Sequence, residues 1–414
     1  MNRQLIYLRT ENFLLFALGA GIFLSKPVIY AASALLTVYF LIRLVIDNTY
    51  RREVFSNKLI ISALVIYVFG VLACLLMPTS WDDLTLIARK SLYLVIFAPL
   101  LIAFRNTTNR GAALAGLLIG FWIAGLLTIL TAEQITATRL PGATWLVDVW
   151  GVLCSLFLVF LTPYAFDRRW HFYWRAFFAV TALFSLALLI LSGARGPWLG
   201  AAAALFIYFL LYQRKFLGLL FIIAAISYLP AKQLFPERLG QIEERVTSIT
   251  QTKTNGSNWI RITLWQLALD YDQEKLPEEP AKLLLGSGGE SHYSDISAFF
   301  ERTETLTTED KAKLVSFGYP SNDMHSMYFD AVAKHGLIWT LANLLFFIAL
   351  ALTAWSKRQP PNQSSLAAPA IVLCFMVTGV FYSLLPHFAA TFLIYFASLA
   401  YASNQTESPE IRHA

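Results

Sequence analysis

The feature that most constrains this chain is a series of long apolar runs that contain few charged residues. A helix needs about 20 consecutive apolar residues to cross the hydrocarbon core of a bilayer. The chain is 57% hydrophobic and 14% charged, whereas soluble domains carry roughly 25% charged residues. The sequence therefore predicts an all-α integral membrane protein, because repeated apolar runs of this length have no place in a soluble fold.

The apolar runs predict about twelve transmembrane helices. The runs lie at 12–25, 28–46, 58–77, 88–104, 112–131, 145–166, 172–192, 197–212, 216–230, 326–354, 366–385 and 388–402. The three cysteines of the chain all fall within these runs and have no regular spacing, so neither a disulfide framework nor a zinc site is expected.

Basic residues in the short connections predict the orientation of the helices, because cytoplasmic loops carry an excess of lysine and arginine. With a cytoplasmic N-terminus, the inner connections contain Arg3, Arg9, Arg51, Arg52, Lys58, Arg105, Arg110, Arg168, Arg169, Arg175, Arg214, Lys215, Lys357 and Arg358. The short outer connections contain only Lys26, Arg89, Lys90, Arg139 and Arg195. This asymmetry predicts that both termini face the cytoplasm, which an even number of spans also requires.

A hydrophilic segment at 231–325 separates the ninth and tenth predicted spans and would lie on the outer side of the membrane. Within it, residues 238–250 have the mixed polarity of a surface helix, and residues 258–275 carry apolar residues at helical spacing. We expect a turn at 252–258 and a loop punctuated by proline and glycine at 277–295. The predicted organisation is an N-terminal bundle at 1–230, a large, partly helical loop at 231–325, further transmembrane helices at 326–402 and a cytoplasmic tail at 403–414.

Arg195 lies in LSGARGPWLG, a very short turn between the seventh and eighth predicted spans. Gly193, Gly196 and Pro197 permit a tight reversal of the chain there. A guanidinium group held at the membrane surface by a stiff turn is suited to bind a lipid phosphate. The alternative is an arginine that extends to the surface and contacts ordinary headgroups.

Two further candidates belong to the large loop. Arg261 lies on the helix predicted at 258–275, where a solvated basic residue is the simpler interpretation when that residue is considered alone. His325 lies in SNDMHSMYFD at the end of the loop, and a histidine there can abstract a proton from a hydroxyl or orient a phosphate. An interfacial histidine bonded to a loop carbonyl group is the alternative.

Other polar features carry weaker signals. Asp82 and Asp83 are adjacent carboxylates without further spaced ligands, which favours solvated side chains over a divalent-metal site. The segment GSGGESH contains Gly286, Gly288 and Gly289, whose backbone amides can wrap a phosphate. It lacks the lysine of a nucleotide-binding loop, so no nucleotide or other cofactor is expected.

Several ionisable residues within or beside the spans are interpreted as structural. Lys334 follows Asp330 by four residues, a spacing that permits an ion pair along one helix. Asp148 and Asp330 are candidate buried polar links, and His335 and His387 are expected to have structural roles.

The order of these features resembles the O-antigen ligase family, within the wider superfamily of O-antigen ligases and polymerases. The family has an arginine turn after a mid-chain span, a large periplasmic loop, and a histidine followed by a glycine eleven residues later. Here GARG contains Arg195, and HSMYFDAVAKHG runs from His325 to Gly336. NWIRITLWQLAL, with Arg261, resembles the arginine helix of the family, and LLLGSGG resembles the G-x-G segment that often precedes the histidine. Ser326 stands where asparagine often follows the histidine, so the hydrogen-bonding role of that neighbour stays open.

The resemblance covers the topology of the whole chain, with residue-level matches confined to about 195–340. It implies a GT-C-like, inverting and metal-independent glycosyltransferase without a cofactor, in the inner membrane of a Gram-negative bacterium. It implies that Arg195 and Arg261 bind the pyrophosphate of an undecaprenyl-linked glycan and that His325 acts at the reaction centre. The implied acceptor is a sugar hydroxyl of lipid A–core, reached from the periplasm.

Three alternatives remain at this point. An O-antigen polymerase uses the same donor but often carries two sizeable outer loops, whereas the second outer loop here, at 132–144, is short. A protein O-oligosaccharyltransferase is a third enzyme of this kind. A secondary transporter of twelve helices would show related halves and ionisable residues near the bilayer midplane, and the sequence has no clear repeat of that kind.

Overall fold

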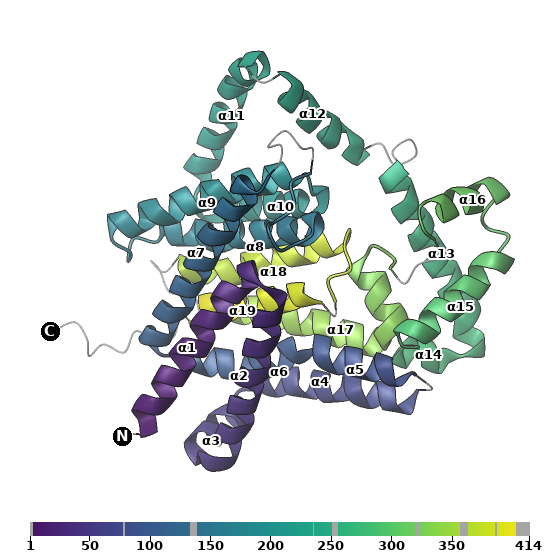
Figure 1. Ribbon diagram of the computed structural model, residues 1–414, viewed down its shortest axis with the longest axis horizontal. Helices are drawn as coiled ribbons and strands as arrows, with labels where there is room; N and C mark the ends of the chain where they lie inside the picture. Colours follow the sequence, from purple (N-terminus) through teal and green to yellow (C-terminus); the bar gives the residue numbers. More distant parts are fainter. Residues whose placement is uncertain are drawn as a thin grey trace.

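Every element of regular structure in the described part of the chain is a helix (Figure 1). This computed structural model describes residues 3–77, 79–132, 139–234, 236–250, 256–319, 323–356, 363–385 and 387–402. Lys357, Arg358, the tail at 403–414 and most of the turn predicted at 252–258 lie outside the described residues.

Nine helical segments of the described chain are long and apolar enough to cross a membrane. They are formed by α1 (Arg3–Leu24), α2 (Lys26–Ile46), α4 (Lys58–Leu76), α5 with α6 (Trp81–Lys90 and Leu92–Ala103), α7 (Thr107–Leu130), α8 (Val147–Phe166), α9 (Phe172–Ser192), α10 (Arg195–Tyr212) and α17 (Met327–Ser356). Each coincides with one of the twelve predicted spans. The prediction of an all-α integral membrane protein is confirmed.

The remaining three predicted spans correspond to α11 (Arg214–Leu234), α18 (Ala367–Gly379) and α19 (Phe388–Ala402). Two of them, α18 with the 3-10 turn at Ser364–Leu366 and α19, are apolar but shorter than the nine. The number of long spans in the described chain is therefore lower than twelve. A short polar helix, α3 (Asn48–Ser56), connects α2 to α4.

The centre of the bundle consists of helices that are apolar on every side. All residues of α8 from Trp150 to Tyr164 and all described residues of α19 after Phe388 are buried, which explains why neither helix has a polar face. Their rings pack together, with centroid distances of 5.9 Å between Phe157 and Phe396 and 5.4 Å between Phe160 and Phe396. Figure 1 shows α8, α18 and α19 inside a layer of the other membrane helices.

Polar residues mark the beginnings and ends of the helices. Asp47, Asn57 and Asn106 accept hydrogen bonds from the first free amides of α3, α4 and α7, so each helix begins at its own cap. Gly193 ends α9 in the left-handed conformation, with φ 62°. Because α10 begins two residues later, the predicted tight turn at Arg195 is confirmed.

The large loop folds into five helices, three of which share a small hydrophobic core. The helices are α12 (Pro236–Thr250), α13 (Gly256–Glu278), α14 (Pro280–Leu285), α15 (Gly289–Arg302) and α16 (Thr308–Ser316). The core is shared by α13, α15 and α16 and includes Leu264, Leu267 and Tyr271 of α13 with Phe299 of α15, which confirms the helical spacing predicted for 258–275.

The prediction of a loop at 277–295 is wrong, since the end of α13, all of α14 and the first half of α15 occupy this segment. Proline suits the first turn of a helix, where its missing N–H group has no partner to lose, and Pro280 begins α14 in this way. Only the short stretch from Gly286 to Gly288 between the two helices is non-helical.

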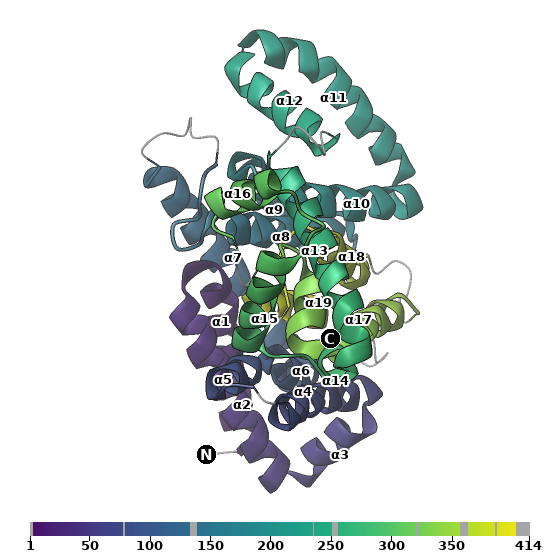
Figure 2. The same ribbon diagram turned by 90° about the vertical axis from the view of Figure 1, so that its right-hand side faces the viewer.

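Helices α13 to α16 gather at one end of the bundle, and Figure 2 shows them in front of it. The beginning of α1 and the helix α3 lie toward the opposite end (Figure 1). Helices α11 and α12 leave the bundle and return as an arch that joins α10 to α13 (Figures 1 and 2). The end of the bundle covered by α13 contains a large cavity.

Candidate active site

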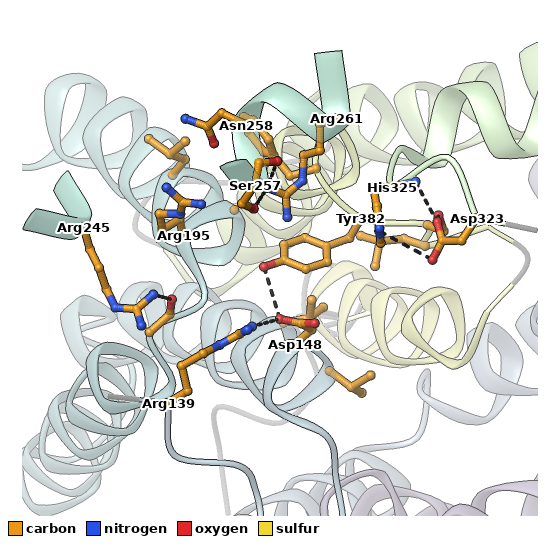
Figure 3. Close-up of a pocket in the computed structure, with 18 of the residues that line it drawn as sticks. Arg139, Asp148, Arg195, Arg245, Ser257, Asn258, Arg261, Asp323, His325 and Tyr382 are labelled. Carbon is orange, nitrogen blue, oxygen red and sulfur yellow. Dashed lines mark hydrogen bonds and ion pairs between the residues drawn. The ribbon is translucent and has the colours of Figure 1, made fainter. Parts of the chain in front are cut away.

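A cavity of about 940 Å³ lies where the membrane helices meet the helices of the large loop. Its walls come from the start of α8, the α9–α10 turn, α12, α13, the residues before α17 and the segment between α18 and α19. Arg195, Arg261 and His325 all line this cavity, as Figure 3 shows. The fold thus brings together three side chains that are far apart in the sequence.

Arg195 is held at the beginning of α10. Its Nη1 donates a hydrogen bond to Ser248 Oγ on α12, at 2.5 Å. The next residue, Gly196, packs so closely against Tyr382 that a Cβ atom there would lie 2.5 Å from the tyrosine ring. The glycine therefore lets the turn that carries Arg195 approach the segment between α18 and α19.

Arg261 lies on the first turns of α13. Its Nη1 donates to Ser257 Oγ at 2.7 Å, and its guanidinium carbon lies 5.9 Å from the centre of the Tyr382 ring, within the range of a cation–π contact. The hydroxyl of Tyr382 donates to Asp148 Oδ1 at 3.4 Å, and this carboxylate also accepts from Arg139 Nη2 at 2.7 Å. Burial, followed by the neighbouring Asp148, raises the pKa of Tyr382 to about 12, so this hydroxyl stays protonated.

His325 lies beside a carboxylate. The backbone N–H of His325 donates to Asp323 Oδ1 at 2.7 Å, and His325 Nδ1 lies 3.6 Å from Asp323 Oδ2. The hydroxyl of Ser383 donates to Asp323 Oδ1 at 2.5 Å. His325 has φ 51°, a conformation that is uncommon for any residue except glycine. Burial opposes ionisation of Asp323, but His325 and Ser383 outweigh it and hold the pKa of this carboxyl below its ordinary value.

Two arginines of the cavity were not among the predicted site residues. Arg245 on α12 donates from Nη1 to the carbonyl oxygen of Gly193 at 3.1 Å, and Arg139 pairs with Asp148. Burial and then the charge of Arg139 lower the pKa of Arg245, because the cationic form is disfavoured beside a second cation. With Arg195 and Arg261, four arginines line the cavity.

Among the described residues that line the cavity, three have carboxylate side chains (Asp148, Glu244 and Asp323), one fewer than the four with guanidinium groups. An excess of cationic groups around a partly enclosed volume favours an anionic ligand, and fork-shaped guanidinium donors suit phosphate oxygens. His387 also lines the cavity, where burial and then Lys90 lower its pKa to about 4.

The glycines of GSGGESH do not line this cavity; they contact α17. Ser287 donates from both its amide and its hydroxyl to the carbonyl oxygen of Ala333, and the Gly288 amide donates to that of Lys334. These carbonyl groups are available because α17 is interrupted at Gly336, with φ 84° and ψ 159°. Residues 287–288 therefore supply hydrogen-bond donors to the carbonyl groups that the break in α17 leaves without helical partners.

The weaker candidates lie near the same glycine segment. Asp83 accepts a hydrogen bond from the Gly289 amide at 2.5 Å, and the described residues contain no group of three histidine, cysteine or acidic side chains that could hold a metal ion. Lys334 Nζ lies 3.2 Å from Asp330 Oδ1, which confirms the predicted ion pair. His335 packs against Trp339 in the interior.

The described fold and this cavity define a class: a multi-pass membrane protein built of helices, with an arginine-lined cavity between its apolar bundle and the helices α12 and α13. Residues 180–344 match the family model described as O-Antigen ligase. No curated protein matches the chain. The matched residues include Arg195, Arg261, His325 and Gly336, and they place this part of the chain in the O-antigen ligase family, as the sequence motifs predicted.

This match supports a glycosyl-transfer function of the O-antigen ligase and polymerase type, which belongs to lipopolysaccharide biosynthesis. Lipid-linked polysaccharide and lipid A–core are the partners of this family in general, and the apolar helices agree with a multi-pass inner-membrane protein.

Proposed function

We propose that the protein is an O-antigen ligase that transfers a polysaccharide from undecaprenyl pyrophosphate to a sugar hydroxyl of lipid A–core. The observation that carries this proposal is the convergence of Arg195, Arg261 and His325 on one cavity. A diphosphate leaving group needs cationic partners, and a hydroxyl nucleophile needs a base, and this cavity offers both.

In this proposal Arg195 and Arg261 bind the diphosphate of the donor. As the bond between the sugar and the diphosphate breaks, negative charge grows on the departing phosphate oxygen, and guanidinium groups placed there stabilise the transition state. Ser248, Ser257 and Tyr382 orient these two arginines through the contacts described above. Positive charge supplied by arginines is the basis on which we propose a metal-independent reaction.

His325 is the proposed base. It accepts the proton of the acceptor hydroxyl while that oxygen bonds to the anomeric carbon, and the bond from this carbon to the diphosphate breaks in the same displacement. In the view of Figure 3, Arg261 lies between Arg195 and His325. A base and a leaving-group site on different sides of the reacting carbon favour attack opposite the leaving group, which inverts the anomeric configuration.

Asp323 is a positioning residue in this proposal. It fixes the backbone at His325 through the amide hydrogen bond, and its carboxylate lies close enough to stabilise the imidazolium that forms when His325 takes the proton. Ser383 in turn fixes the carboxylate. This arrangement follows the general logic of a base that is oriented by a third group.

We further propose that the cavity faces the periplasm and that the loop at 231–325 is a periplasmic unit between the helices at 1–230 and 326–402. The basic residues Arg51 and Arg52 lie on α3, toward the end of the bundle opposite the cavity, in agreement with a cytoplasmic location. ATP is absent from the periplasm, so the energy for transfer has to come from the sugar–diphosphate bond of the donor.

The test is complementation of a deletion strain, read out on a lipopolysaccharide gel. Arg195→Ala, Arg261→Ala and His325→Ala should each abolish polysaccharide attached to lipid A–core, with polymer accumulating on the carrier lipid. Loss of one oxyanion donor costs about 2–4 kcal/mol, or on the order of 10²–10³-fold in rate. Ladders retained by all three variants would refute the site.

Matched controls come from the same residue types away from the cavity. Arg302 is an exposed arginine of α15 that pairs with Glu274, and His171 is an exposed histidine before α9. Arg302→Ala and His171→Ala should transfer as the wild type does. A deletion strain that keeps single repeat units on the core would instead identify a polymerase.

A further inference from the structure

A second cavity, of about 570 Å³, lies at the opposite ends of the helices that form the candidate active site. Helix α8 begins at the active site with Asp148, and its far end, Phe166, lines the second cavity. Gln213, directly after the far end of α10, lines it too, whereas α10 begins at Arg195. The two cavities are therefore separated by about the length of a membrane-spanning helix.

Two arginines with unused donors lie at this cavity. Arg175 donates from Nε to the carbonyl oxygen of Ala165 at 3.2 Å, and within the described chain no residue accepts a hydrogen bond from its two Nη atoms. Arg168 is exposed and has no hydrogen-bond or ion-pair partner among the described residues. By contrast, the neighbouring Arg169 is occupied by Asp167 and Ser364.

The described wall of the cavity is mainly apolar. Ala165, Phe166, Ala179 and Phe216 contribute to it, beside the amides of Gln213 and Gln363. Immediately before Arg175, the rings of Phe172, Tyr173 and Trp174 are exposed. Exposed aromatic rings at the start of a membrane helix mark the boundary between lipid and water. The cavity thus combines a basic edge with an apolar wall at that boundary.

We propose that this cavity binds one anionic phospholipid, with its phosphate on Arg168 and Arg175 and an acyl chain against Phe166 and Phe216. A free inorganic anion would satisfy the guanidinium groups but leave the apolar wall uncovered. A zwitterionic phospholipid brings its own cation to the phosphate, which competes with the arginines. Basic pockets between membrane helices are suited to anionic headgroups for these reasons.

The bound lipid would join the ends of α8, α9 and α10, since the lining comes from all three helices or their connections. The same helices hold Asp148, Gly193 and Arg195 at their other ends. Occupancy is therefore expected to stabilise the bundle that supports the candidate active site, whatever reaction that site performs.

The experiment is a titration of the full-length, delipidated protein in detergent, followed by native mass spectrometry. The probes are dioleoylphosphatidylglycerol and dioleoylphosphatidylcholine, which differ in headgroup but not in acyl chains. We expect one saturable phosphatidylglycerol site that is preferred by about 30-fold, since each guanidinium beside an anionic headgroup contributes roughly fivefold. Inorganic phosphate should not displace the lipid.

Arg168→Gln combined with Arg175→Gln should remove this preference, whereas Arg51→Gln combined with Arg52→Gln should retain it. Ala179→Trp keeps both arginines and fills the cavity, and it should also remove saturable binding. The melting temperature of each variant without lipid reports whether it is folded. Equal binding of the two lipids, an unchanged preference in the double arginine variant, or displacement by inorganic phosphate would overturn the proposal.

Discussion

Gly336 is a position at which a single added methyl group should strongly destabilise the protein. Its φ of 84° and ψ of 159° lie in a region of backbone conformation that is essentially reserved for glycine. A Cβ atom there would also overlap the backbone carbonyl groups of Leu284 and Leu285, neither of which can rotate away as a side chain can. Gly336→Ala therefore combines backbone strain with a steric clash.

The two effects can be given rough magnitudes. A residue forced into such a conformation costs about 1–3 kcal/mol, and overpacking a tight contact costs about 1–3 kcal/mol more. A total of about 2–6 kcal/mol corresponds to a fall in melting temperature of roughly 2–7 °C for a chain of 414 residues, from the average entropy of unfolding per residue.

Substitutions at two other glycines separate the cost of backbone strain from the cost of steric overlap. Gly318 has φ 87° but open space where a Cβ atom would lie, so Gly318→Ala should show the strain without the clash. Gly111 has neither feature and lies in α7, so Gly111→Ala should be neutral or slightly stabilising. The assay is thermal unfolding of the purified variants in detergent. Equal melting temperatures for Gly336→Ala and Gly111→Ala would refute the reasoning.

Three further changes have defined outcomes. Asp323→Asn should lower the turnover rate about 10–100-fold with little change in the KM for the donor, because it affects the base and not diphosphate binding; a change in KM alone would contradict this role. Arg245→Ala should weaken donor binding on the order of tenfold, as expected for one hydrogen bond to a charged group, which direct binding measurements would show. Burial raises the pKa of Asp272 to about 6, above its value in the unfolded chain, so its contribution to stability is complete below about pH 4 and is lost as the pH rises through 6. Asp272→Asn should remove this loss, and melting curves at pH 5 and pH 7.5 would then differ less than those of the wild type.

The membrane helices and the residues of the candidate site could largely be predicted from the sequence. A long apolar run can cross a bilayer only as a helix, so nine of the predicted spans were found, although the first begins nine residues and the fourth seven residues earlier than predicted. The turn at Arg195 followed from its glycines. Arg261 and His325 were predicted through short motifs in order along the chain, although no local property of either residue distinguishes it from a solvated arginine or histidine.

Arg245 shows why part of the site could not be predicted. It lies in a helix of mixed polarity, where an arginine next to glutamates is most simply interpreted as a solvated surface residue. Its contact with Gly193 depends on the arch of α11 and α12, which no local sequence pattern predicts. The glycine segment at 286–289 shows the reverse case. From the sequence, we expected its backbone amides to bind a phosphate. In the structure they donate to carbonyl groups of α17 that the break at Gly336 leaves without helical partners, and the sequence does not reveal this break.

The most direct test of the central claim measures whether Arg195 and Arg261 act on the same diphosphate. Proteoliposomes containing purified lipid-linked donor and lipid A–core would report the transfer rates of Arg195→Lys, Arg261→Lys and the double variant, since lysine keeps the charge but not the paired donors. Groups that stabilise one transition state together are not additive, so the double variant should be far less impaired than the product of the two single effects predicts. A rate equal to that product would show that the two arginines act independently and would contradict a shared reaction centre.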